Sequence, residues 1–219
     1  MIETNLNIEL YIARHGQTAM NLDRSVIGGR NVQTELDDQG IQQAITLGEN
    51  LGRIGLQPDL IFSSPAIRAL QTAEYCLQAM GCELRPEVDE RLHEMSQGSW
   101  EGRSRAEIYT EAQVAKILSA PETFRAPRGE SMVHVAARQL SFVEEMVHRA
   151  EEAEQQPLVA LAFGHGLATL ILAGTYLGWS VDTMRQDQRT PNASLSLFTY
   201  NQEDWQVAFI GKDAATLTA

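Results

Sequence analysis

The chain contains 219 residues, of which 43% are hydrophobic and 21% are charged. These proportions are typical of folded globular proteins and exclude an intrinsically disordered chain. With 17 basic and 29 acidic side chains, the formal net charge is −12, which opposes non-specific attraction to nucleic acid and to anionic membrane surfaces. We therefore predict one folded domain spanning residues 1–219 that binds neither nucleic acid nor a membrane.

Signals for membrane insertion or export are not found in the sequence. The longest apolar runs, such as residues 158–163 and 167–173, fall well short of the roughly 20 residues that a spanning helix needs. Residues 1–5 carry neither a basic flank nor an apolar signal core, so we expect a cytoplasmic protein. Cys76 and Cys82 are spaced unlike a redox or zinc motif, and we expect a pair of buried reduced thiols.

Short apolar strands alternate with amphipathic helices along the chain. We expect strands at residues 8–13, 59–62 and 158–163, and a final hairpin formed by 194–200 and 205–210. We expect helices at residues 38–54, 65–80, 106–118, 131–154 and 166–177, the second of them capped by Ser64. Strands separated by helices form parallel sheets with helices on both faces. The sequence therefore predicts an α/β fold, a three-layer αβα sandwich with a mostly parallel central sheet.

The middle of the chain departs from this alternation. Residues 98–129 are less regular and contain Pro121 and Pro127 in a loop, so we interpret residues 103–130 as a small lid-like insertion. This segment carries five basic and four acidic side chains, whereas the rest of the chain is strongly acidic. The local charge favours an acidic small molecule as ligand, with Arg125 and Arg128 as candidate contacts.

Three strand-to-helix corners carry basic side chains. The first reads Arg-His-Gly-Gln-Thr at residues 14–18, the second places Arg68 one turn into a helix, and the third reads Gly-His-Gly at residues 164–166. The carboxyl ends of parallel strands meet at one edge of a sheet, where ligands bind. Each side chain alone is more often structural, but together they predict an anion pocket. Arginine forks and a helix start suit phosphate, although carboxylate or sulfate would fit the charge as well. A neutral histidine adds a nucleophile for phosphoryl groups.

The same residues resemble the motifs of a known family. Residues 14–18 followed by Asn21 resemble the signature of the histidine phosphatase superfamily, the phosphoglycerate mutase-like proteins. Further matching motifs follow in the family's order at residues 63–65 with Arg68, at 92–94, 98–102, 129–131, 164–166 and 192–194. Any one of these strings is weak, but together they are highly specific and cover nearly the whole chain.

The resemblance implies a role for each matching residue. His15 would be the nucleophile that accepts the phosphoryl group, and Glu94 would protonate the leaving oxygen and then activate water. Residues that would bind the phosphoryl oxygens are Arg14, Arg68 and His165, with further donors from Asn21 and the backbone near Gly28 and Gly166. The resemblance implies no metal and no cofactor. We assign no catalytic role to His93, His134 or His148, and interpret Glu101 as structural.

Three functions remain open at this point. The first is a phosphatase for a small-molecule phosphate monoester, which we favour. The second is a mutase, but cofactor-dependent mutases have Glu-Ser after the first His-Gly and a longer middle insertion, whereas this chain has Gln17-Thr18. The third is a phosphate-binding or scaffold protein, although such relatives usually lose the nucleophile or the acid, and His15 and Glu94 are both present.

Overall fold

The protein is built around a six-stranded sheet with strand order β3-β2-β4-β1-β5-β6. The computed structural model describes residues 6–153, 156–185 and 190–218. The strands are β1 (Asn7–Arg14), β2 (Leu60–Ser63), β3 (Glu87–Val88), β4 (Leu158–Gly164), β5 (Leu195–Asn201) and β6 (Trp205–Lys212). The pairs β1–β4, β4–β2 and β2–β3 are parallel, and the pairs β1–β5 and β5–β6 are antiparallel. The prediction of a mostly parallel sheet with a final hairpin is confirmed.

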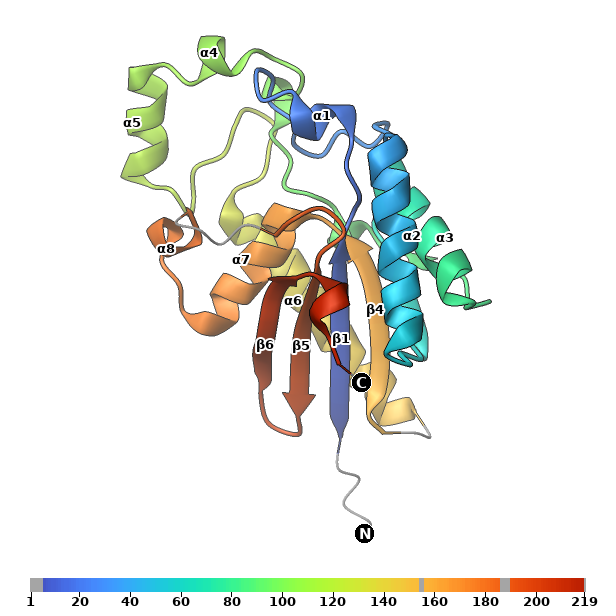
Figure 1. Cartoon of the computed structure of the whole chain (residues 1–219). Helices are drawn as coiled ribbons and strands as arrows, with labels where there is room; N and C mark the ends of the chain where they lie inside the picture. Colours follow the sequence, from blue (N-terminus) through green and yellow to red (C-terminus); the bar gives the residue numbers. More distant parts are fainter. Residues whose placement is uncertain (1–5, 154–155, 186–189, 219) are drawn as a thin grey trace.

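Helices cover both faces of the sheet (Figure 1). The long helices are α2 (Asp38–Arg53) and α3 (Ile67–Met80) on one face, and α6 (Met132–Glu152) and α7 (Gly166–Leu177) on the other. The shorter ones are α1 (Ala19–Leu22), α4 (Arg105–Ile108), α5 (Glu111–Ser119), α8 (Val181–Arg185), η1 (Glu90–Leu92), η2 (Gly98–Trp100) and η3 (Ala214–Thr216). The predicted three-layer αβα architecture is therefore confirmed. Within the described ranges, no helix is both long and apolar enough to cross a bilayer.

The alternation of side chains along β1 explains this layering. Ile8, Leu10 and Ile12 point to the face where Phe142 of α6 and Leu172 of α7 complete a buried cluster. Intervening positions of the strand join a second cluster on the face covered by α2 and α3. Burying one such aliphatic or aromatic side chain contributes about 1.5–3 kcal/mol, so two fully buried clusters hold the sheet rigidly between its helices.

Two helix boundaries differ from the sequence prediction. Helix α3 begins at Ile67 after Ala66, which has no side chain that could cap it, so the prediction that Ser64 caps this helix is wrong. The Ser64 hydroxyl lies 2.9 Å from Nε2 of His165 instead. The single helix expected at residues 106–118 is two helices, α4 and α5, because Tyr109 leaves the helical conformation and Thr110 caps α5 through the amide of Gln113.

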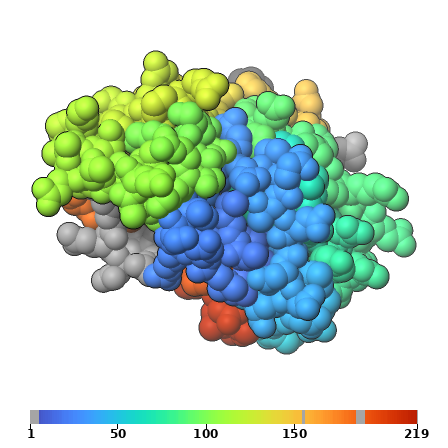
Figure 2. Space-filling view, turned by 90° about the horizontal axis from the view of Figure 1, so that it is seen from above, coloured from blue at the N-terminus to red at the C-terminus, as the bar shows by residue number. Residues whose placement is uncertain are grey.

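The carboxyl ends of β1, β2 and β4 face the segment that contains α4 and α5. In Figure 1 these two helices lie above the sheet, on the side where β1 and β4 end. In Figure 2, which views this end of the molecule, they lie beside the blue segment around residues 20–35. A bridge between Val26 and Ser104 joins the two segments. The corners singled out in the sequence thus lie at the same end of the molecule as the middle of the chain.

Candidate active site

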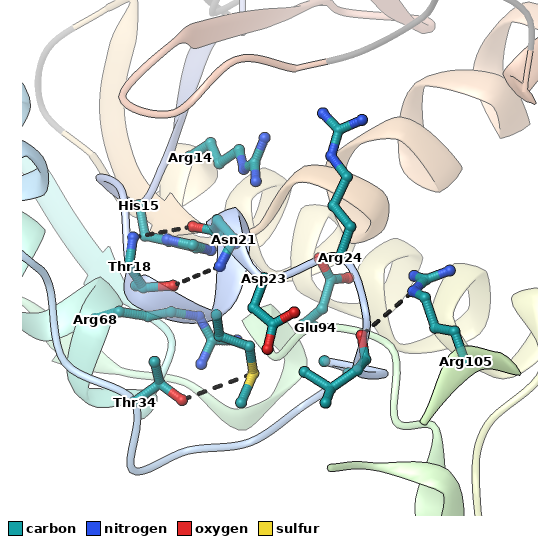
Figure 3. A pocket seen from close by; sticks show the side chains of 14 residues that line it. Arg14, His15, Thr18, Asn21, Asp23, Arg24, Thr34, Arg68, Glu94 and Arg105 are labelled. Carbon is teal, nitrogen blue, oxygen red and sulfur yellow. Dashed lines mark hydrogen bonds between the residues drawn. The ribbon is translucent and has the colours of Figure 1, made fainter. Parts of the chain in front are cut away.

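A cavity of about 540 Å³ opens at the carboxyl ends of the strands. Five of the predicted side chains line it, namely Arg14, His15, Asn21, Arg68 and Glu94, and so does Gly28, which was predicted as a backbone donor. Figure 3 shows their side chains arranged around a common space. Sequence reasoning did not identify the other polar side chains of its wall, which include Thr18, Asp23, Arg24, Thr34 and Arg105. Strongly basic groups therefore surround a cavity in a protein whose net charge is −12.

His15 follows the last residue of β1, and its ring is 3% exposed. Its Nδ1 atom lies 2.7 Å from the carbonyl oxygen of Gly16, so Nδ1 carries the proton and donates it. In the neutral ring this leaves Nε2 with a free lone pair. Burial, and then the charges of Arg68 and Arg14, hold the pKa of His15 well below its ordinary value. The imidazole is therefore neutral at pH 7 and has the tautomer that a nucleophile needs.

Gly16 lets this corner pack closely against α2. A Cβ atom at this position would lie 2.4 Å from the carbonyl oxygen of Gly40. The amide of Gly16 donates to Oγ1 of Thr72 at 3.0 Å, and that hydroxyl donates to the carbonyl of Arg68 at 2.6 Å. The corner that carries His15 is therefore fixed to both α2 and α3.

Arg68 is only 5% exposed, and two groups of hydrogen-bond acceptors hold its guanidinium, namely the carbonyls of one loop and the ring of His165. Its guanidinium donates to the carbonyl oxygens of Asn31 at 2.5 Å and Arg30 at 3.3 Å. It also donates to Nδ1 of His165 at 3.2 Å. Burial lowers the pKa of Arg68, opposed by the charge of Glu94, but a guanidinium keeps its proton in proteins. Arg68 thus presents a fixed positive charge to the cavity.

Arg14 has a buried donor without a partner. Its NH1 group donates to the carbonyl of Thr190, whereas its Nε atom is buried and has no hydrogen-bond partner among the described residues. The side chain passes close to Gly166, where a Cβ atom would lie 3.2 Å from both Cδ and Nε of Arg14. An unpaired buried donor is costly, and an anion in the cavity would satisfy it.

The side chain of Glu94 lies at the N-terminus of α7 and accepts hydrogen bonds there. Its Oε1 accepts from the amides of Met95 at 2.8 Å and Ala168 at 3.0 Å, and its Oε2 accepts from the amide of Leu167 at 3.2 Å. These bonds fix the carboxyl group at the cavity wall. Two amides at this helix start, those of Leu167 and Ala168, are thus already used by Glu94. Gly166, predicted as a backbone donor to phosphate, lies beside the Arg14 side chain.

His165 lies behind the cavity wall rather than in it. Because Arg68 donates to its Nδ1, its Nε2 carries the proton and donates to the Ser64 hydroxyl at 2.9 Å. The Ser64 oxygen lies 3.5 Å from Nδ1 of His93. Burial, followed by the charge of Arg68, holds the pKa of His165 well below its usual value. Its ring centroid lies 5.2 Å from that of His15, so His165 contacts both the nucleophile candidate and Arg68.

Glu101 connects the loop that holds Arg68 to the middle segment. Its Oε1 accepts from the Arg30 amide at 3.0 Å and the Gln97 amide at 2.8 Å, and its Oε2 accepts from the Asn31 amide at 3.3 Å. A Cβ atom on Gly29 would lie 2.7 Å from the same carboxylate. The structural role expected for Glu101 agrees with these contacts. We call this arrangement the Glu101 clasp.

The family model described as "Histidine phosphatase superfamily (branch 1)" matches residues 10–213 of this chain. The chain belongs to the histidine phosphatase superfamily. A probable phosphoglycerate mutase GpmB of Erwinia tasmaniensis is 28% identical over 200 residues, which cover 90% of this chain and 87% of that protein. A glucosyl-3-phosphoglycerate phosphatase of Mycobacterium tuberculosis is 37% identical over 172 residues, 75% of this chain and 74% of that protein.

Solved structures agree with this membership. The native structure of a mycobacterial glucosyl-3-phosphoglycerate phosphatase superposes with a TM-score of 0.79 at 31% identity, covering 94% of this chain and 100% of that chain. A phosphoglycerate mutase from Bacillus anthracis superposes with a TM-score of 0.77 at 21% identity, which shows the shared fold. Histidine phosphatases named for hydrolysis and for mutase activity are thus both similar to this protein.

The arginine of the middle segment that lines the cavity is not one of the two that we expected to contact the ligand. Arg125 and Arg128 do not line the cavity, whereas Arg105 does. Arg105 donates from Nε to the carbonyl of Val26 at 3.3 Å and lies over the ring of Tyr109 at 5.4 Å from its centroid. Residue charge alone could not distinguish these arginines, because their charge is the same and only the folded structure shows which of them faces the cavity.

Proposed function

We propose that this protein is a metal-independent phosphatase that hydrolyses a small-molecule phosphate monoester through a phosphohistidine intermediate on His15. The observation that carries the proposal is the state of the His15 ring. It is buried, neutral and protonated on Nδ1, with Nε2 free beside two fixed guanidinium groups. A site that only binds phosphate needs the guanidinium groups but not a histidine in this tautomer.

The first step forms a bond between Nε2 of His15 and phosphorus while the ester P–O bond breaks. Glu94, entering the step protonated, gives its proton to the leaving oxygen, so an alcohol departs. Arg14 and Arg68 neutralise the charge on the non-bridging oxygens, which is the main requirement of phosphoryl transfer. Asn21 and His165 complete the proposed phosphate site, His165 by orienting Arg68 and by its contact with the His15 ring.

The second step hydrolyses phosphohistidine. The Glu94 carboxylate takes a proton from water, whose oxygen attacks phosphorus as the P–N bond breaks. Inorganic phosphate leaves, the lone pair returns to Nε2 of His15, and Glu94 is protonated again. Residues 103–130 would act as a lid that shields this step, since Arg105 from that segment already forms part of the cavity wall.

The test is phosphate release from 4-nitrophenyl phosphate in excess EDTA by the native protein, His15→Ala, Glu94→Ala and the control His148→Ala. The His148 side chain is 79% exposed and lies far along α6, so its replacement should leave turnover unchanged. We expect metal-independent turnover that is lost in His15→Ala and reduced by about 10²–10⁴ in Glu94→Ala. Full turnover in His15→Ala, or turnover abolished by EDTA, would refute the phosphohistidine route.

The mutase alternative shares the first step and differs in the fate of the phosphoryl group. Incubation with a phosphoglycerate therefore separates the two functions by comparing released phosphate with phosphate moved to the second hydroxyl. We expect release to dominate. Transfer in excess of release would reassign the protein to phosphoglycerate mutase chemistry.

A further inference from the structure

A second cavity, of about 430 Å³, adjoins the active-site cavity. It lies between α5, η2, the start of α7 and α8, and most of its wall is apolar. Its lining includes Met95, Trp100, Val114, Leu118, Phe124 and Leu167. Its volume lies in the range of cavities that hold small molecules. The catalytic steps proposed above use none of these side chains, so the cavity needs its own explanation.

The helix over this cavity is packed unusually loosely. None of the residues of α5 is buried, although Val114 and Leu118 are large and apolar. They are 36% and 54% exposed, and Leu167 across the cavity is 38% exposed. Single exposed apolar residues are common on protein surfaces, but a group of them around one concave site indicates a ligand or a partner.

Two features join this cavity to the active site. Arg105 lines both cavities. Met95 and Leu167, which line the apolar one, are also the residues whose amides donate to the Glu94 carboxylate at 2.8 and 3.2 Å. Glu94 lines the active-site cavity and is the proposed proton donor to the leaving oxygen, so its bonds to Met95 and Leu167 place the carbon atoms attached to that oxygen close to the apolar cavity.

We propose that the apolar cavity binds the leaving group, and that the substrate is a phosphate monoester whose alcohol carries a hydrocarbon chain or ring rather than several hydroxyl groups. This inference rests on the proposed function. A polyhydroxylated sugar would lose most of its hydrogen bonds to water against these side chains, because Gln97, Arg105 and Tyr109 are the main polar groups of the wall, and unpaired hydroxyls are costly to bury. A hydrocarbon gains by the same burial.

The test uses alkylphosphonates, whose C–P bond is not hydrolysed, so binding is measured independently of turnover. Titration calorimetry compares hexylphosphonate with ethylphosphonate, which differ by four methylene groups. Each buried methylene raises affinity about fourfold, so partial burial of the chain gives a preference for hexylphosphonate of at least about tenfold. Excess inorganic phosphate should compete with both compounds, which places their phosphonate group in the active site.

Two matched variants locate the effect. Leu118→Asn removes a 54% exposed leucine from the cavity wall, and Leu84→Asn removes a 47% exposed leucine that does not line it. We expect the preference for hexylphosphonate to fall below about threefold in Leu118→Asn and to stay unchanged in Leu84→Asn. Melting curves of both variants verify that they are folded.

Several outcomes would overturn the inference. Equal affinities of the native protein for the two phosphonates would refute it even if phosphatase activity is found, whereas absent turnover with an intact hexyl preference would refute only the catalytic proposal. A preference that survives inorganic phosphate would place binding elsewhere. If Leu118→Asn keeps the preference but changes the sedimentation coefficient, the apolar wall belongs to an interface with a second copy of the chain.

Discussion

Replacement of Gly16 by alanine tests how closely catalysis depends on the packing of the first corner. The added Cβ would lie 2.4 Å from the carbonyl oxygen of Gly40 and 2.9 Å from its carbonyl carbon, whereas ordinary contacts begin at 3.4 Å. The obstacle is the backbone of α2, which cannot rotate away as a side chain could. The corner and the helix must therefore separate by about 1 Å, and this displacement reaches His15, the residue directly before Gly16. A displacement of this size costs roughly 10²-fold in rate, and the strain costs about 1–3 kcal/mol of stability.

The assay is kcat for 4-nitrophenyl phosphate together with the melting temperature, and Gly52→Ala is the matched control. Gly52 lies in the same helix, where a Cβ would meet nothing closer than the Met80 carbonyl oxygen at 3.7 Å. Alanine there should stabilise the protein by about 0.5–1 kcal/mol without changing kcat. A Gly16→Ala enzyme with kcat within threefold of the native value would refute the argument that this contact positions the nucleophile.

Three further predictions follow from the site. Burial lowers the pKa values of His15, His93 and His165, that of His93 to about 4, so these rings stay neutral in the folded state while the unfolded chain protonates them below about pH 6.5. The three neutral rings therefore contribute fully to the free energy of unfolding above pH 6.5, and this free energy should fall by up to about 4 kcal/mol per pH unit as the pH drops toward 5. Urea titrations at several pH values measure this dependence, and a decrease of less than a third of that size per pH unit would contradict three neutral rings. Inorganic phosphate at about 100 times its Kd should stabilise the native protein by about 2.7 kcal/mol, which raises Tm by roughly 5–10 °C. The Arg14→Met variant should lose most of this increase in Tm. An undiminished increase in Tm would show that Arg14 does not bind phosphate. Glu101→Ala should raise KM about tenfold with kcat changed less than threefold, a loss of about 1.4 kcal/mol in binding, and an unchanged KM would show that the Glu101 clasp does not support phosphate binding.

Much of the fold could be predicted because its signals are local. The strands next to the corners are apolar runs. Helices α2 and α6 carry periodic apolar stripes and side-chain caps, and α7 is a long apolar run that ends at Gly178. The two-residue strand β3 was missed because pairing with β2 alone defines it. The start of α3 was misplaced because Ser64 bonds to His165, 101 positions away, and no local pattern reports such a contact.

The candidate site could be assembled from the corners for the same reason, since strand ends bring Arg14, His15 and Arg68 to one edge. The hydrogen bonds within the site could not be predicted from the sequence. Glu94 bonds to the start of α7 from 74 positions away, and no local pattern in the sequence reports that contact. Likewise, the tautomer of His15 depends on a carbonyl that only the folded corner orients.

The Glu101 clasp joins two loops separated by 70 positions in the chain. One of them supplies the carbonyl groups that grip Arg68, and the other leads into the segment over the apolar cavity. Under the functions proposed above, affinity for phosphate and choice of leaving group should therefore change together. If the middle segment were replaced by that of a relative, residues 28–31 and Glu101 would have to be replaced together with it. Insertions should be tolerated better around α5 than next to Glu101.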